Sequence, residues 1–125
     1  MSVLAPTQIR VHTGSRTLEL VYADGRRFVL PAQYLRVHSP SAEVQGHGPG
    51  QEVLVHGKES VGISAVEPIG HYAVRIVFDD GHDTGLYTWK TLQELAESHT
   101  ERWARYLERL AQAGVIRNPE KERPG

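Results

Sequence analysis

The spacing of apolar residues changes once along this chain, and that change constrains the fold. From Gln8 to Phe78 apolar residues recur mainly at every second position, the period of a half-buried β-strand. From Thr88 onward they recur every three or four residues, as on an amphipathic helix. Strands followed by helices favour an α+β domain: a mostly antiparallel sheet of about six strands with two C-terminal helices packed at one side.

The first part of the sequence predicts two or three strands between Gln8 and Leu30. Asp24-Gly25 is typical of a tight hairpin turn, because both residue types tolerate positive φ. Pro31 is expected to close the last of these strands, since proline has no N–H to donate. The alternating apolar residues are Ile9, Val11, Leu18, Leu20, Tyr22, Phe28 and Leu30.

The middle of the sequence is expected to hold a long loop and three more strands. Residues from Val37 to Gln51 are rich in glycine, proline and serine, which favours a surface loop. Short strands are predicted over Glu52–His56 and Val61–Val66, and the strongest strand over Tyr72–Phe78, which ends in the turn Asp79-Asp80-Gly81.

Two helices are expected near the C-terminus. Thr88 and Thr100 are suitable N-cap residues, and Gly114 is a natural end for the second helix. The second helix carries an apolar stripe that we expect to pack onto the sheet. Its members are Trp103, Tyr106, Leu107 and Leu110.

The length of 125 residues, with 39% hydrophobic and 23% charged residues, is typical of one globular domain. We place this domain at 8–114. Residues 1–7 are expected to be a flexible N-terminus, and residues 115–125, nearly all proline and charge beyond Asn118, a disordered tail.

Composition excludes several classes of function. The chain has no cysteine, so it cannot form disulfides, thiolate zinc sites or a cysteine-held iron–sulfur cluster. A net charge of -1 lacks the broad basic field that nucleic acid or anionic membranes require. Without an apolar run of membrane-spanning length, which is about 20 residues, a cytoplasmic protein that binds neither nucleic acid nor membrane is expected.

The densest group of polar residues is the turn Asp79–Gly85. Its carboxylates and imidazole suit a hard or borderline cation, or an acid and base, although aspartate and glycine are also ordinary turn residues. A second candidate group is His38 with Ser39, Ser41 and Glu43. A serine hydrolase would need a base and an orienting acid beside one of these serines, and the sequence places neither there.

Two stretches support a family resemblance: LRVHSPSAE at 35–43 and VEPIGHYAVRIVFDDGHDTGLYTWKTLQEL at 66–95. They closely resemble the gamma-butyrobetaine hydroxylase-like N-terminal domain family, over roughly residues 9–110. Members of this family occur as small bacterial proteins, as the front domain of carnitine-synthesis oxygenases, and joined to P-loop ATPases with iron–sulfur clusters. In the oxygenases the domain binds a structural zinc through three cysteines and one histidine, and the catalytic residues lie in another domain.

The resemblance places the family's histidine ligand at His82 and its cysteine ligands on or near Ser39, Ser41 and Val44. Serine and valine do not replace thiolates as zinc ligands, so the family's zinc site is expected to be lost. A different site would form if the fold brought His38 and Glu43 beside His82 and Asp83. Such nitrogen and oxygen ligands would hold iron or zinc.

The main hypothesis is therefore a non-catalytic accessory module that assists a protein partner, such as an iron–sulfur assembly factor or an iron oxygenase. The resemblance also suggests a homodimer. The alternative is a stand-alone metal-binding protein that holds iron or zinc through His82, Asp83, His38 and Glu43. A third hypothesis is an enzyme that uses the Asp79–Gly85 turn as acid and base, although no catalytic motif accompanies it.

Overall fold

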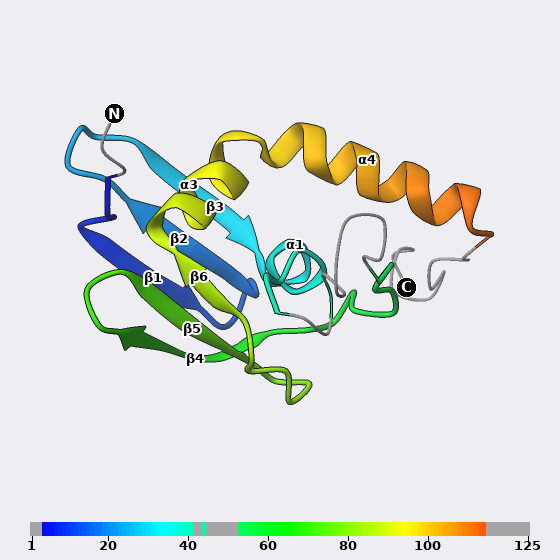
Figure 1. The fold of residues 1–125 in the computed structure, drawn as a ribbon, viewed down its shortest axis with the longest axis horizontal. Coiled ribbons are helices and arrows are strands. Elements are labelled where there is room, and N and C mark those ends of the chain that lie inside the picture. The colour runs from blue at the N-terminus through cyan, green and yellow to red at the C-terminus, as the bar shows by residue number, and fades with distance from the viewer. Residues whose placement is uncertain (1–3, 42–43, 45–52, 115–125) are drawn as a thin grey trace.

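A computed structural model of the chain describes residues 4–41, 44 and 53–114. Within them lie six strands, which form two three-stranded antiparallel sheets, and three helices (Figure 1). The first sheet contains β1 (Gln8–His12), β2 (Thr17–Val21) and β3 (Arg27–Pro31), and the second contains β4 (Ile63–Ile69), β5 (Ala73–Phe78) and β6 (Leu86–Thr88). The helices are α1 (Ala32–Val37), α3 (Trp89–Glu97) and α4 (His99–Gln112).

The first sheet confirms the N-terminal strand predictions. The turn between β2 and β3 is the predicted hairpin, and Gly25 adopts a φ of 92° that glycine tolerates without strain. The inner face of the sheet is buried through Leu18, Leu20 and Leu30. The predicted α+β class, with about six antiparallel strands before two C-terminal helices, is confirmed.

The second sheet follows the predicted alternation along β5. Val74, Ile76 and Phe78 are buried, whereas Arg75 and Val77 lie on the opposite, half-exposed face. Gly81, in the turn after β5, has a φ of 93°.

Two predictions in this region were wrong, and one strand was missed. Tyr72 precedes β5 and is 55% exposed, so it does not belong to the buried face of that strand. Residues 53–56 form no strand, which corrects the prediction over Glu52–His56. The short strand Leu86–Thr88 was not predicted, because three residues give too little alternation to recognise.

The core lies between the two sheets and beneath α3 and α1. Its inner residues come from both sheets and from α3, and Tyr34 of α1 ties α3 in place by donating a hydrogen bond of 2.6 Å to the carbonyl oxygen of Leu95. The largest fully buried side chains are Tyr22, Tyr34, Tyr87 and Phe78.

Helix α1 was not predicted, because Pro31 was taken only as the end of a strand and six residues are too short for a clear periodicity. Proline suits a helix start, since its missing N–H is not needed there. The loop predicted over Val37–Gln51 is described only at 37–41 and 44. The predictions for residues 1–3 and 115–125 also lie outside the described residues.

The two C-terminal helices are confirmed, with one correction at a cap. Thr88 caps α3 as predicted, by accepting a hydrogen bond from the N–H of Thr91 at 3.1 Å. Helix α4 begins at His99 after Ser98, so the cap predicted at Thr100 is wrong.

The apolar stripe of α4 does not pack on a sheet as predicted. Tyr106 and Leu110 instead form a second small core with Val37 of α1, beside Leu54 and Val55. The hydroxyl of Tyr106 donates to the carbonyl oxygen of Val55 at 2.6 Å.

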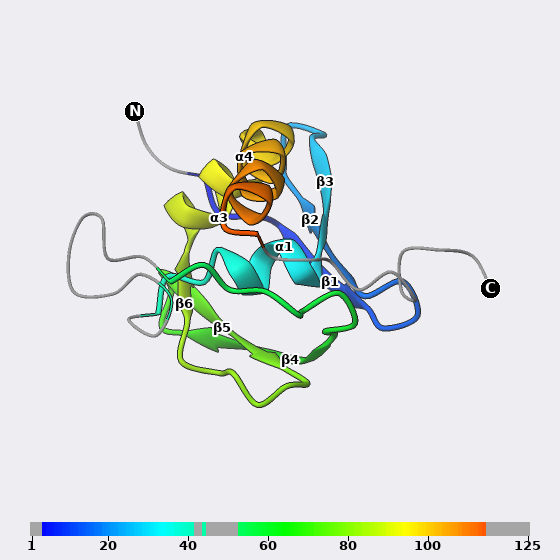
Figure 2. The same cartoon turned by 90° about the vertical axis from the view of Figure 1, so that its right-hand side faces the viewer.

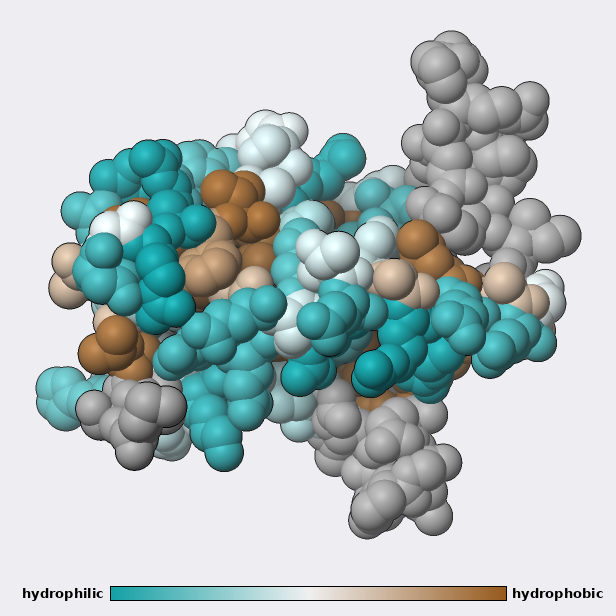
Figure 3. Space-filling view, turned by 90° about the horizontal axis from the view of Figure 1, so that it is seen from above, coloured by the Kyte–Doolittle hydropathy of each residue, from teal (hydrophilic) through white to brown (hydrophobic). Residues whose placement is uncertain are grey.

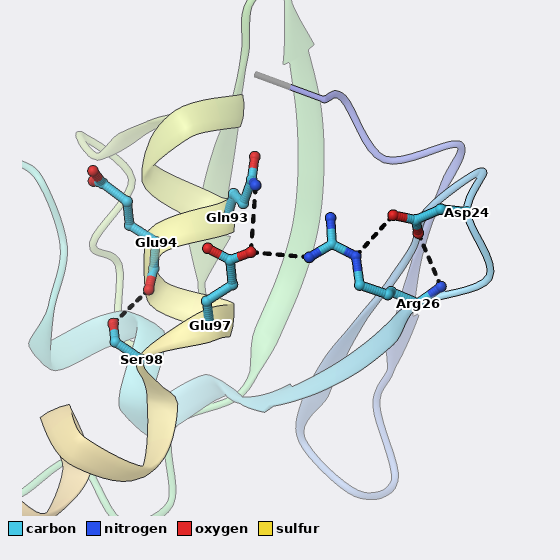
Figure 4. Close-up of polar contacts among 6 residues, drawn as sticks. All are labelled: Asp24, Arg26, Gln93, Glu94, Glu97 and Ser98. Atoms are coloured by element: carbon cyan, nitrogen blue, oxygen red, sulfur yellow. Dashed lines mark hydrogen bonds and ion pairs between the residues drawn. The ribbon is translucent and has the colours of Figure 1, made fainter. Parts of the chain in front are cut away.

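Arg26 fastens the first hairpin to α3 (Figure 4). Its guanidinium lies 2.9 Å from carboxylate oxygens of both Asp24 and Glu97, and it rests over the rings of Tyr22 and Phe28. This contact fixes the end of the first sheet against the last turn of α3.

The surface over α3 and α4 is mainly hydrophilic, with apolar side chains in small separate groups (Figure 3). Among the described residues, no helix combines the length and apolar character that a bilayer span requires.

Candidate functional site

Ser39 and His82 form the centre of the candidate site. Ser39 follows α1, and His82 lies in the turn between β5 and β6. The Ser39 Oγ and His82 Nε2 atoms are 2.9 Å apart, a hydrogen-bond distance. Both residues are buried, with 0% and 6% of their surface exposed. The fold therefore joins two segments that are 43 positions apart.

Further hydrogen bonds extend this contact on both segments. The N–H of Ser41 donates to Ser39 Oγ at 3.3 Å, and Thr84 Oγ1 donates to Ser41 Oγ at 2.9 Å. Val44, also buried, donates its N–H to the carbonyl oxygen of Ser41 at 3.0 Å. Three hydroxyl groups and one imidazole thus connect the loop after α1 to the β5–β6 turn.

Gly85 lets the two segments approach each other. A Cβ atom at this position would lie 2.4 Å from Ser39 Oγ and 3.2 Å from a ring carbon of Tyr87. A larger residue would push Ser39 away from His82. The hydroxyl of Tyr87 donates to the carbonyl oxygen of Leu35 at 2.6 Å, and burial raises the pKa of that hydroxyl.

Asp80 is the fixed carboxylate of the same turn. Its Oδ2 lies 2.9 Å from Arg36 Nε and 2.6 Å from Lys58 Nζ, and its Oδ1 accepts from the N–H of His82 at 3.1 Å. Burial alone would raise the pKa of Asp80. The hydrogen bonds from Lys58, His82 and Arg36 outweigh that effect and lower the pKa to about 2. Asp80 is therefore a permanent anion at neutral pH and a poor general base.

Asp79, Gly81 and Asp83 of this turn are exposed. Asp79 and Asp80 border a shallow, open cavity of about 210 Å³, together with Lys58 and Ser60. The turn is consequently held by internal ion pairs and backbone bonds, as expected of a structural turn.

His38 lies in a different environment from its neighbour Ser39. Its Nδ1 is 2.9 Å from the carbonyl oxygen of Tyr34, and its ring packs near the rings of Tyr34 and Tyr106. Burial lowers the pKa of His38, and the positive charges of Arg102 and Arg109 lower it further. His38 thus contacts α4, whereas Ser39 contacts His82.

The metal ligands proposed from the sequence are not brought together in the part of the chain that the structure describes. No group of three or more histidine, aspartate or glutamate side chains suited to a metal occurs there. Glu43 lies outside the described residues. At the positions where the resemblance implied zinc ligands, the structure has His82, the hydroxyls of Ser39 and Ser41, and a valine at position 44. Neutral hydroxyls and a methyl group do not fit zinc.

The comparisons agree with this architecture. Residues 9–93 match the family described as gamma-butyrobetaine hydroxylase-like, N-terminal. The chain belongs to this family. The resemblance proposed from the sequence is thereby confirmed over most of the described domain. Comparison with the curated proteins gives no match.

Among the solved structures that match, three illustrate the similarity in both sequence and fold. Two are solution structures determined by nuclear magnetic resonance. The first is 52% identical with a TM-score of 0.82, covering 94% of this chain and 93% of that one. The second is 48% identical with a TM-score of 0.79, covering 93% and 86%. The third is the crystal structure of a protein of unknown function from Acidithiobacillus ferrooxidans, 41% identical with a TM-score of 0.61, covering 73% and 91%.

The contact between Ser39 and His82 is the feature that sequence reasoning missed. A serine beside a histidine at this distance resembles two members of a hydrolase triad. Ser39 is fully buried, however, and a nucleophile must be open to its substrate. The sequence signal for the contact was the family resemblance, which implied that zinc ligands of the family fall at His82 and on or near Ser39.

Proposed function

We propose that this protein is a non-catalytic accessory module that binds a protein partner, such as an iron–sulfur assembly factor or an iron oxygenase. The observation that carries the proposal is the closed site at His82. This histidine is 6% exposed and bonded to Ser39, so it serves to hold two segments together.

The other reactive groups of the site support the same conclusion. Asp80 is held by Arg36 and Lys58, which keeps it charged and oriented toward the protein. A group that already has two cationic partners gains little by accepting a substrate proton. These contacts hold the site rigid. A rigid domain loses little conformational entropy when it binds a partner, so it is suited to binding.

The family description also supports the proposal, because it names a domain that is N-terminal in gamma-butyrobetaine hydroxylase-like proteins. A domain with that placement works beside another one. We infer that this domain likewise works beside a protein partner.

Affinity capture tests the proposal. The tagged protein is incubated with an extract of its source organism, and a different small domain with the same tag is the control. We expect one protein to be enriched reproducibly and to retain the untagged chain when it is itself tagged. Candidates related to iron–sulfur assembly or iron oxygenases are then titrated in purified form. Absence of any reciprocally captured protein would contradict the proposal.

Stand-alone binding of iron or zinc is the hypothesis that would replace ours. The described donor set gives it no support, and the metal content of the purified protein tests it.

A further inference from the structure

The outer face of the first sheet carries an arrangement of charges that the site at His82 does not involve. Figure 2 shows α1 and α3 on one side of this sheet, where its inner face enters the core. The opposite face presents every second residue of β1, β2 and β3. We call this surface the outer face. Its three cross-strand rows are Gln8–Val21–Arg27, Arg10–Glu19–Val29 and His12–Thr17–Pro31.

Glu19 is the acid at the centre of the outer face, and it is only 4% exposed. Its carboxylate lies 2.8 Å from His12 Nε2 and 3.2 Å from Arg27 Nη1. The hydrogen bond from His12 lowers the pKa of Glu19 against the effect of burial, and the charges of Arg27 and Arg10 lower it further. A buried anion at the middle strand therefore holds cationic groups above it in fixed positions.

The cationic groups on this face exceed the single acid. The guanidinium of Arg10 is bonded to the neutral amide of Gln8, at 2.6 Å from its Oε1, so its charge is not cancelled. The side chain of Arg27 shares Glu19 with His12 and is 65% exposed. The face is thus positive on a protein whose net charge is -1.

An apolar residue lies among these charges. Val29 is directly opposite Glu19 on β3 and is 51% exposed. Since strands of a sheet are about 5 Å apart, Arg10 on β1 and Arg27 on β3 lie on opposite sides of the face, separated by about 10 Å across the strands. Val29 follows Arg27 by two positions on β3 and shares a cross-strand row with Arg10. Two cationic groups with an apolar residue beside them fit an extended segment that carries carboxylates and an apolar residue.

We propose that the outer face of β1, β2 and β3 is a docking surface for an acidic, extended segment of a protein partner. Carboxylates of the segment pair with Arg10 and Arg27, and an apolar side chain rests on Val29. Glu19 is a positioning residue that orders Arg27 and His12 before the partner arrives, which reduces the entropy lost on binding. This inference rests on the proposed function as a binding module and names its surface and the chemistry of its partner.

The direct test uses a fluorescein-labelled peptide that alternates glutamate and valine, measured by fluorescence anisotropy. The test variant is Arg10→Gln with Arg27→Gln, and the matched control is Lys90→Gln with Arg105→Gln, which removes the same charge from exposed positions on α3 and α4. We expect saturable binding that weakens by about tenfold or more in the test variant and stays unchanged in the control.

Two further measurements complete the test. Val29→Glu adds a negative charge at an exposed position without removing a buried contact. This variant should weaken binding of the peptide to a similar extent. Amide shifts in a ¹⁵N spectrum should change along β1 to β3. Equal binding by test and control variants, no saturable binding, or tighter binding of a uridine oligonucleotide than of the peptide would overturn the proposal.

The outcome is separable from that of the proposed function. If the wild type and the Arg10→Gln, Arg27→Gln variant capture a partner equally well, the protein is a binding module but the outer face is not its docking surface. If the peptide binds at the outer face but no partner is recovered from the extract, the docking surface is supported and the proposed accessory role is contradicted.

Discussion

The hydroxyl of Ser39 and the imidazole of His82 are hydrogen-bonded in the protein interior, 2.9 Å apart. Each comes from a segment with little regular structure of its own, so this contact and the bonds around it fix the loop after α1 against the β5–β6 turn. Removing one member of a buried polar pair costs free energy, because the other member loses a hydrogen bond that water does not replace.

The first prediction concerns that pair. Ser39→Ala and His82→Ala should each lower the free energy of unfolding by about 1–3 kcal/mol, since each leaves a buried polar group without its partner. The loss of unfolding free energy in the double variant should be about 1 kcal/mol smaller than the sum of the losses in the two single variants. Urea unfolding of all four proteins measures this coupling, and strictly additive losses would show that the contact contributes nothing.

The second prediction concerns Gly85. Gly85→Ala should destabilise the protein by about 2 kcal/mol, because the added methyl group would lie 2.4 Å from Ser39 Oγ. In a Ser39→Ala background the same change should cost less, since the clashing atom is gone. Thermal unfolding checks both values. An equal cost in the two backgrounds would place the strain elsewhere, such as at Tyr87.

The third prediction concerns pH and Asp80. The pKa of this carboxyl is about 2 in the folded protein against an ordinary value of 3.8. A depressed pKa stabilises the folded state fully above 3.8, and this contribution is lost as the pH falls from 3.8 through about 2. At pH 7, Asp80→Asn should therefore cost about 2 kcal/mol.

Asp83→Asn is the matched control for Asp80, because it changes an exposed carboxylate of the same turn. It should alter stability by no more than about 0.5 kcal/mol. Urea unfolding between pH 7 and pH 2.5 should show the penalty of Asp80→Asn shrinking as the pH falls below 4. A penalty that stays constant with pH would refute the assignment of charge pairing at Asp80.

The fourth prediction concerns His38 and His99, which flank Tyr34 between α1 and α4. Their rings lie 4.7 and 4.4 Å from that of Tyr34, and burial lowers the pKa of both below 6.5. As the pH falls below 6.5 the unfolded chain takes up protons that the folded chain resists, so stability should decrease.

Proton titration by nuclear magnetic resonance should place the pKa of both His38 and His99 below 6.5. The variant His38→Gln should lose stability less steeply between pH 7 and pH 5 than the wild type. An identical pH profile in both proteins would mean that His38 does not contribute.

The fifth prediction concerns metal. Untagged protein purified without chelator should contain no stoichiometric iron or zinc by elemental mass spectrometry, since His82 Nε2 is bonded to Ser39 and hydroxyls are poor ligands. His82→Ala should leave the metal content unchanged. Stoichiometric metal that disappears in this variant would instead establish the metal-binding hypothesis and displace the accessory role.

The sequence by itself determined the fold class, because period-two alternation and helical spacing are local consequences of one buried face. It located the hairpin at Asp24-Gly25 and the cap at Thr88 for the same reason, since turn and cap chemistry act within a few residues. The family resemblance placed His82 and the serines at former ligand positions, again from local sequence.

The tertiary structure decided what those residues do. Short elements such as α1 and β6 carry too few residues for a periodic signal, and the start of α4 shifted from Thr100 to Ser98 where the helices meet. Only the folded chain brings Ser39 to His82 and turns the adjacent His38 toward α4. Contacts between residues far apart in sequence depend on how the sheets and helices pack, and no local pattern encodes them.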